Sequence, residues 1–519
     1  MKAARLALVA ALLLGAASVF SFAPFGFSLL PALTLAGLFA LWQRAASARA
    51  AAAVGFAFGA GFFGAGVSWV FIALHTFGGM PGVLAAIGTA GFCGLLALYP
   101  ALAGWLTTRW TPPSSLPRLI AAAPAWTLCE WLRSWLLSGF GWLSIGYAQV
   151  QSPLAGYAPI GGVFLTGFGL ALSAALLVAI VQAAEAHWPA RAAVLAAVIG
   201  GVWLGGYALS TVEWSRPSSA PLTVSLVQGN IEQDLKFDPE YRDKTLAVYA
   251  DLVARAQGRL IVLPESALPM FADEVPADYV ARLRDAALAH GGDILLGLFF
   301  FEPRERADED DRYFNSVVSI GSSMTQVYRK HHLVPFGETI PAKPVMGWFI
   351  RNVLSIPLAD QTPGPAYQEA FAAAGERLAV NICYEDSFGG ELARRAADAT
   401  LLVNVTNDAW YGRSIAAEQH EQIAAMRAVE TARPMLRATN TGITSIVNHR
   451  GAEQARLPWF TRGILEGTIS GRTGTTPYVR FGDALVAALA MLVFCAALFA
   501  ARRSGNRTAS GLFRERPIQ

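Results

Sequence analysis

The sequence predicts two parts: a multi-pass α-helical membrane domain with eight spans, and a globular α/β domain. Of the 519 residues, 54% are hydrophobic and only 15% are charged, which is too apolar for an ordinary soluble protein. No Asp precedes Asp234, and the first 214 residues contain only three Glu. The chain from about residue 215 to 480, in contrast, has the composition of globular sequence.

Apolar segments of membrane-spanning length explain the first part. Seven of them fall within the first 210 residues, and each approaches the ~20 residues that cross a bilayer as a helix. They leave almost no polar surface to face water, which argues against a soluble protein with buried helices. We predict a transmembrane domain at 1–214, a globular domain at 215–480, a final span at 481–501 and a tail at 502–519. The eight spans are predicted at residues 5–22, 27–42, 54–74, 83–106, 119–137, 161–180, 192–209 and 484–500.

Basic residues set the orientation. Nearly all those between the predicted spans lie on one side of an alternating topology, and only Arg133 lies near the other. The positive-inside rule therefore predicts cytoplasmic termini and a globular domain outside the cytoplasm. The first segment, preceded by Lys2 and Arg5, has features of a signal peptide. We predict an uncleaved span, because more spans follow and residues 20–25 are a poor cleavage site.

The globular part alternates strand-like and helix-like segments, which predicts a layered α/β domain with its chemistry at strand ends. One helix is well marked, with Asp238 as N-cap and Pro239 in its first turn. Strands are predicted at 222–227, 260–263, 294–299, 316–320, 326–328, 378–382, 401–405, 435–438 and 444–447, and helices at 239–256, 277–290, 388–398 and 416–431.

One cysteine stands out in this part. Cys383 ends the apolar run of LAVNICYEDS (378–387), whereas Cys93, Cys129 and Cys495 fall in apolar spans and offer it no disulfide partner. A helix-like segment follows, so we expect the positive end of a helix dipole to stabilise a Cys383 thiolate. The alternative is an inert, buried cysteine.

Two other segments share this pattern of a strand that ends at a titratable residue. They are LIVLPES with Glu265 and QVYRKHHLVPFGE with Lys330. A carboxylate, an ammonium and a thiol that converge at one sheet edge provide a base, an oxyanion stabiliser and a nucleophile. Acyl transfer through a thioester requires this set.

In these motifs, Glu265, Lys330 and Cys383 resemble the Glu-Lys-Cys triad of the nitrilase superfamily. The eight-span frame around them resembles the apolipoprotein N-acyltransferase family, and the likeness covers nearly the whole chain. The family often has Trp where this chain has Phe237, so we expect a modest change in packing or lipid contact there. Other similar stretches are QGNIEQDLKFD (228–238), VNVTNDAWYG (403–412) and RATNTGITS (437–445).

The resemblance implies a four-layer αββα sandwich on the periplasmic side of a bacterial inner membrane. Glu265 would take the thiol proton, Cys383 would attack an acyl ester of a phospholipid such as phosphatidylethanolamine, and Lys330 would stabilise the oxyanion. The amine of a diacylglyceryl-cysteine at an apolipoprotein N-terminus would then accept the acyl chain. Such a ping-pong reaction needs no metal and no cofactor.

The resemblance and the position of neighbouring residues suggest supporting roles. Glu338 resembles a carboxylate that orients the lysine of the triad, with a surface residue as the alternative. Tyr384 would lend its backbone N–H to the oxyanion, and Glu385 would brace the site, for instance by pairing with Lys330. The alternative is that Tyr384 and Glu385 are simple loop residues.

Aromatic residues suggest how the lipid is contacted. Trp410 and Tyr411 follow a strand and would line an acyl pocket, although aromatics more often serve packing. The segment 345–358, VMGWFIRNVLSIPL, is too short to span and oddly apolar for a loop. We predict a lid in which Trp348 and Phe349 enter the bilayer. Core packing is the alternative.

Some functions are disfavoured. A net charge of +3 with scattered basic residues does not suggest nucleic-acid binding. His331, His332, His420 and His449 form no recognisable metal motif, and polar or packing roles are expected for them. A membrane-tethered amidase acting on a carbon–nitrogen bond remains an alternative enzyme. A lipid-binding module with an inactive domain is the third possibility.

Overall fold

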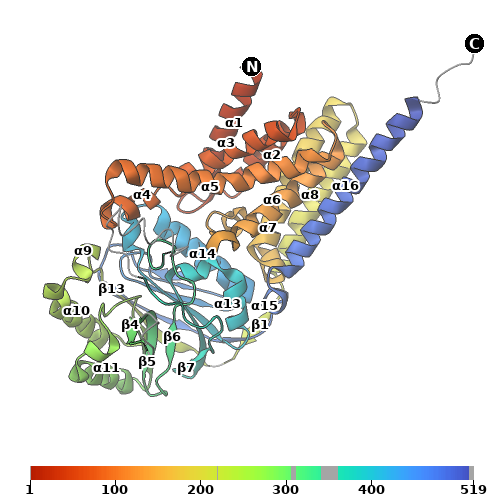
Figure 1. The fold of residues 1–519 in the computed structure, drawn as a ribbon. Helices are drawn as coiled ribbons and strands as arrows, with labels where there is room; N and C mark the ends of the chain where they lie inside the picture. The colour runs from red at the N-terminus through yellow and green to blue at the C-terminus, as the bar shows by residue number, and fades with distance from the viewer. Residues whose placement is uncertain (1, 219, 305–310, 341–359, 513–519) are drawn as a thin grey trace, which may run out of the picture. The chain divides into compact units, whose positions relative to one another are not determined.

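The computed structural model describes residues 2–218, 220–304, 311–340 and 360–512. The chain forms two compact units (Figure 1). The helical unit comprises Met1–Ser68, Ala86–Val212 and Asp483–Gln519, and the sheet unit comprises Trp69–Ala85 and Glu213–Gly482. The segment Trp69–Ala85 thus groups with the sheet unit, although it lies among the spans in sequence.

Long apolar helices build the helical unit, and glycines let some of them approach closely. A Cβ at Gly15 would lie 1.9 Å from the Phe58 carbonyl oxygen, and one at Gly61 would lie 2.0 Å from that of Leu12. These contacts pack the first helix against the third, as small residues do in membrane bundles. The helices are α1 (Lys2–Ser18), α2 (Leu30–Arg44), α3 (Ala48–Gly66), α5 (Gly82–Arg109), α6 (Leu116–Arg133), α7 (Ala158–Glu185), α8 (Pro189–Ser210) and α16 (Ala484–Leu512).

The membrane character of the chain is confirmed, but the predicted number of spans is not. In the described part of the chain, six helices are long and apolar enough to cross a bilayer. The second and fifth predicted spans are not among them. Helix α2 has only 15 residues, and α6 carries Arg118, Glu130 and Arg133 within its 18 residues. The predicted spans were drawn from the apolar residues alone. The short length of α2 and the charged residues of α6 account for the difference.

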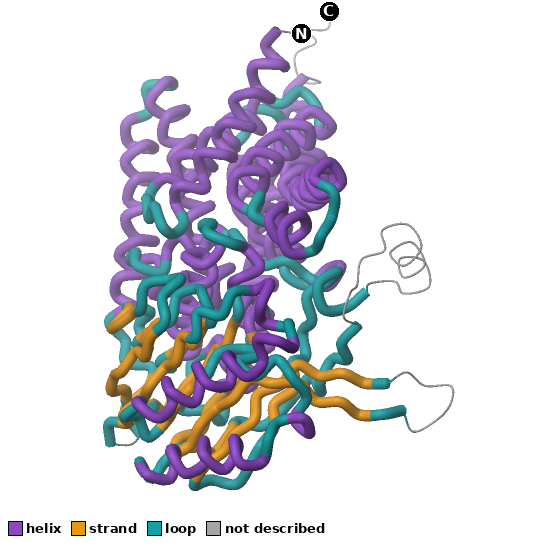
Figure 2. Tube along the Cα trace, turned by 90° about the vertical axis from the view of Figure 1, so that its left-hand side faces the viewer, coloured by secondary structure: helices purple, strands orange, loops and turns teal. Residues whose placement is uncertain are grey.

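Two six-stranded sheets form the centre of the sheet unit, and a small third sheet pairs β1 (Ser215–Pro217) with β14 (Arg472–Gly474). The first large sheet has the order β13-β2-β3-β4-β5-β6, and the second has the order β12-β11-β10-β9-β8-β7. Figure 2 shows the strands in orange. The bounds in the first sheet are β2 Leu222–Gln228, β3 Leu260–Val262, β4 Asp293–Glu302, β5 Arg312–Gly321, β6 Val327–Arg329 and β13 Gly463–Ile469. Those in the second are β7 Phe371–Ala373, β8 Glu376–Ile382, β9 Leu401–Thr406, β10 Met435–Thr439, β11 Ser445–Val447 and β12 Glu453–Arg456.

Helices cover the outer faces of both sheets. Helices α10 (Arg242–Arg255) and α11 (Ala277–Ala289) share a buried apolar cluster with β2 to β5. On the second sheet, α13 (Gly389–Ala396) contacts β8, and α14 (Ala416–Thr431) contacts β10 and β11. The two sheets face each other where β10 meets β2 and β5 meets β8. The nitrilase-like αββα sandwich is confirmed, and every predicted strand and helix of this unit overlaps an observed one.

Candidate active site

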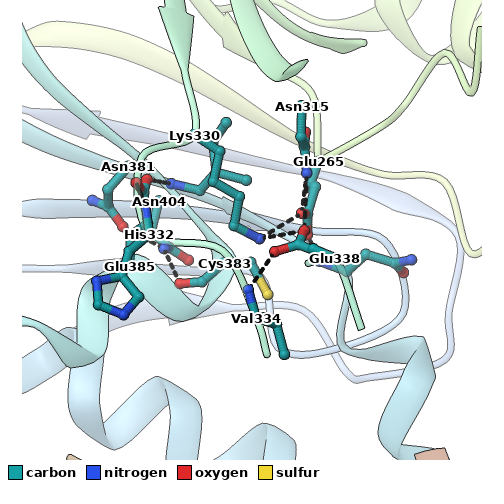
Figure 3. A network of polar contacts seen from close by, with 12 residues as sticks. Glu265, Asn315, Lys330, His332, Val334, Glu338, Asn381, Cys383, Glu385 and Asn404 are labelled. Carbon is teal, nitrogen blue, oxygen red and sulfur yellow. Dashed lines mark hydrogen bonds and ion pairs between the residues drawn. The ribbon is translucent and has the colours of Figure 1, made fainter. Parts of the chain in front are cut away.

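The three residues of the predicted triad follow strands that belong to both large sheets. Glu265 lies three residues after β3, and Lys330 directly follows β6, in the first sheet. Cys383 directly follows β8 in the second. Because the sheets face each other, residues on these strand exits meet between them, as Figure 3 shows. Loops at strand ends thus carry the site, while the strands fix its geometry.

The Lys330 ammonium lies between two carboxylates. Its Nζ is 2.7 Å from Oε1 of Glu338 and 3.3 Å from Oε1 of Glu265, and the lysine is 1% exposed. Burial alone would lower the pKa of Lys330, but Glu265 and Glu338 outweigh it and hold this pKa well above the ordinary value. Lys330 therefore stays charged, as a group that stabilises an oxyanion must.

Glu265 is held in place by three donors. Its Oε1 accepts from Asn315 Nδ2 at 2.7 Å and from Lys330, and its Oε2 accepts from the backbone N–H of Asn407 at 2.9 Å. The backbone around it is fixed too, because Lys236 Nζ donates to the Glu265 carbonyl at 3.0 Å. Burial lowers the pKa of Lys236 to about 8, although Glu265 and Cys383 favour its charged form.

The predicted nucleophile, Cys383, is a buried thiol in a strained backbone conformation. Cys383 is 7% exposed and has a φ of 53°, in the left-handed region that residues other than glycine rarely adopt. Such conformations concentrate at functional sites. In Figure 3 its sulfur faces the same space as the Lys330 ammonium and the Glu338 carboxylate.

The expectation of a thiolate stabilised by a helix dipole is wrong. Burial, and next to it the charge of Glu265, raise the pKa of Cys383 well above the ordinary value, and Lys330 only partly offsets them. The residue opens a single 3₁₀ turn, η9 (Cys383–Ser387), and the helix α13 begins only at Gly389. The resting group is a thiol, so its reaction requires a base that removes the proton.

The predicted supporting residues have different surroundings. Glu338 contacts Lys330 as expected, and its Oε2 accepts from the backbone N–H of Val334 at 2.8 Å. Glu385 braces the site, but through other partners than Lys330. Its carboxylate accepts from the Tyr328 hydroxyl at 2.8 Å and from the backbone N–H groups of Ile382, His331 and His332. Glu385 thereby ties η9, the turn that begins at Cys383 and is called the nucleophile turn below, to the chain that follows Lys330.

The Tyr384 ring packs against aromatic neighbours. Its centroid lies 5.1 Å from that of Phe388 and 6.1 Å from that of His332. The role of the Tyr384 backbone N–H at the oxyanion stays a prediction.

Two of the predicted lipid-contacting aromatics, Trp410 and Tyr411, lie against the segment Trp69–Ala85. Tyr411 packs on Trp69 with ring centroids 4.5 Å apart, and Trp410, 40% exposed, packs on Phe77 at 6.1 Å. Phe237 is 52% exposed and lies 6.3 Å from Phe299. The predicted lid residues Trp348 and Phe349 lie outside the described residues.

Sequence reasoning missed three polar residues of the site. Asn315 lies on β5 and Lys236 in a short helix, α9 (Gln233–Lys236), so only the fold brings them to Glu265. His420 was assigned a general polar or packing role. In the structure it contacts Asp386 and Asp408. Lys236 was within a recognisable stretch, QGNIEQDLKFD, but nothing in that stretch distinguishes it.

Comparison with known sequences agrees with this geometry. Residues 14–176 match the model of the apolipoprotein N-acyltransferase N-terminal domain, and residues 223–478 match that of carbon-nitrogen hydrolases. The apolipoprotein N-acyltransferase of Nitrosomonas europaea is 46% identical over 506 residues, which cover 96% of this chain and 99% of that protein. That of Methylococcus capsulatus is 43% identical over 490 residues, which cover 93% of each. With such similarity over nearly its full length, the chain belongs to the apolipoprotein N-acyltransferase family.

Proposed function

We propose that this protein transfers an acyl chain from a phospholipid to the N-terminal amine of a diacylglyceryl-cysteine on an apolipoprotein, through a thioester on Cys383. Glu265 takes the thiol proton as the sulfur attacks the ester carbonyl. Lys330 stabilises the tetrahedral oxyanion, and as this intermediate collapses Glu265 gives the proton to the leaving oxygen of the lysophospholipid. The acceptor amine then attacks the thioester, and Glu265 assists the proton transfer, so that Cys383 is regenerated.

The arrangement of Lys330 between two carboxylates, beside a protonated thiol, carries this proposal. Glu338 pairs with Lys330 at 2.7 Å and so keeps the ammonium charged and fixes its position, which leaves Glu265 to act as the base. A buried thiol with a raised pKa needs such a base. The relatives named apolipoprotein N-acyltransferase support the choice of an acyl donor and an amine acceptor.

We further propose the location of the site. The chain is a membrane protein, and its basic residues favour an orientation with both termini in the cytoplasm. The sheet unit would then lie on the periplasmic side of a bacterial inner membrane. Three aromatic residues would contact the acyl chains there: the exposed Phe237 and Trp410, and the partly buried Tyr411. A phospholipid such as phosphatidylethanolamine would be the donor.

A discharge experiment tests the acceptor. Protein acylated on Cys383 is mixed with a diacylglyceryl-cysteine peptide whose amine is free, with the same peptide N-acetylated, or with buffer alone. We expect the acyl chain to move to the free amine and to stay on the enzyme in the two controls. Equal loss in all three would show that water is the acceptor and would favour the membrane-tethered amidase.

A further inference from the structure

A second, fully buried charge cluster lies behind the nucleophile turn. It consists of His420 on α14, Asp386 in η9, Asp408 in η10 (Asp408–Tyr411) and Arg437 on β10, each at most 2% exposed. The imidazole Nδ1 lies 2.8 Å from Asp408 Oδ1, and Nε2 lies 3.0 Å from Asp386 Oδ1. Arg437 binds the other oxygens of these two carboxylates, at 3.0 Å and 3.3 Å.

The cluster reaches the main chain of the nucleophile. Nε2 of His420 lies 3.3 Å from the carbonyl oxygen of Cys383, and Nδ2 of Asn404 donates to the same oxygen at 3.1 Å. Asn404 is itself held by Arg437, which donates to its side-chain oxygen at 2.6 Å. The carbonyl of Cys383 therefore lies among donors from α14 and β9, two elements that contribute no residue to the triad.

The hydrogen bonds to the Cys383 carbonyl support the unusual backbone conformation of this residue. A residue with a side chain adopts a φ near 53° only where its surroundings compensate the strain. Two donors on the Cys383 carbonyl fix that peptide in the required direction. With this peptide fixed, the sulfur faces the space that it shares with the Lys330 ammonium and the Glu338 carboxylate.

We propose that His420 is a positioning residue for acyl transfer: as a charged imidazolium it shares its Nε2–H between Asp386 and the Cys383 carbonyl, and so holds the nucleophile in its left-handed conformation. It is therefore not the base of a Cys-His pair. The inference rests on the proposed role of Cys383 as the nucleophile. Asp386 and Asp408 keep the imidazole charged, and Arg437 fixes both carboxylates.

The charge state of His420 agrees with this role. Burial and Arg437 lower its pKa, but Asp386 and Asp408 outweigh them and raise it to about 9. Because the folded-state pKa lies above the unfolded value of about 6.5, the stability that His420 contributes is complete below about pH 6.5. It is lost as the pH rises through about 9.

Two substitutions of His420 distinguish the roles of its two ring nitrogens. The amide of His420→Gln reaches the position of Nε2 and can still donate to the Cys383 carbonyl, whereas that of His420→Asn takes the position of Nδ1 and cannot. Both remove the charge. The measurement is the single-turnover rate of thioester formation on Cys383 per folded protein, together with the melting temperature.

We expect thioester formation to be about tenfold slower in His420→Asn than in His420→Gln, at similar melting temperatures, because one hydrogen bond to the nucleophile separates them. Equal rates in the two variants would overturn the inference. A parent that forms no thioester would instead refute the proposed function, so the two failures are distinct.

A variant that keeps the imidazole gives a second measurement if neither substitution folds. Asp408→Asn removes one of the two charges that raise the pKa of His420. We expect the alkaline decline of the thioester-forming rate, near pH 9 in the parent, to move to lower pH. A decline that stays at the same pH in Asp408→Asn would contradict the proposed role of His420.

Discussion

Glu265→Gln is expected to slow thioester formation by roughly three orders of magnitude at neutral pH, the middle of the range for loss of a general base. The variant lacks the Glu265 charge that contributes to the raised pKa of Cys383, but burial, the larger cause, remains and still disfavours the thiolate. The rate is measured in a single turnover with phosphatidylethanolamine, by the acyl mass gained per folded protein.

The pH dependence of Glu265→Gln distinguishes a role of Glu265 as the base from a purely structural role. Without Glu265, only hydroxide can generate the thiolate, so the rate should rise about tenfold per pH unit between pH 6 and 8.5. The parent should change much less over this range. A Glu265→Gln variant with a pH-independent rate within tenfold of the parent would show that Glu265 is not the base.

Lys330→Met is expected to cause the second large loss, on the order of 10² to 10³ in the rate of thioester formation, because the oxyanion loses its cation. It should also lower the free energy of unfolding by about 3 to 5 kcal/mol, the cost of leaving buried charges without their partner. Glu265 and Glu338 would then face each other across an empty position. Chemical denaturation measures the second effect.

A double variant separates these two consequences. Lys330→Met with Glu338→Gln removes one of the two carboxylates, so much of the lost stability should return while the rate stays low. Glu338→Gln alone is the control for the effect of replacing this carboxylate by an amide. A double variant that regains the parental rate would show that Lys330 acts on stability and not on the oxyanion.

The fold of the sheet unit was largely predictable, because its central strands are buried on both faces. Strands such as β9, Leu401–Thr406, are buried at every position and read as largely apolar runs, which Asn404 interrupts in β9. The strand β13, Gly463–Ile469, was missed. It contains two glycines, three of its seven residues are intermediate in exposure, and it pairs with β2, more than 230 residues away. No local pattern shows such a partner.

The site was predictable only where chemistry coincides with a strand end. Glu265, Lys330 and Cys383 met this condition. His420 and Lys236 lie on helices, and their partners come from other elements, so their roles depend on tertiary contacts. The expected thiolate was wrong because local sequence reveals the following helix but not the depth of burial, and burial dominates the pKa of Cys383.

The most direct test of the proposed reaction is the intact mass of the purified parent protein and of Cys383→Ala after incubation with phosphatidylethanolamine in mixed micelles. We expect the parent alone to gain the mass of one acyl chain, and hydroxylamine at neutral pH to remove it, as it removes a thioester. The same gain on Cys383→Ala, or no gain on the parent, would contradict a thioester on Cys383.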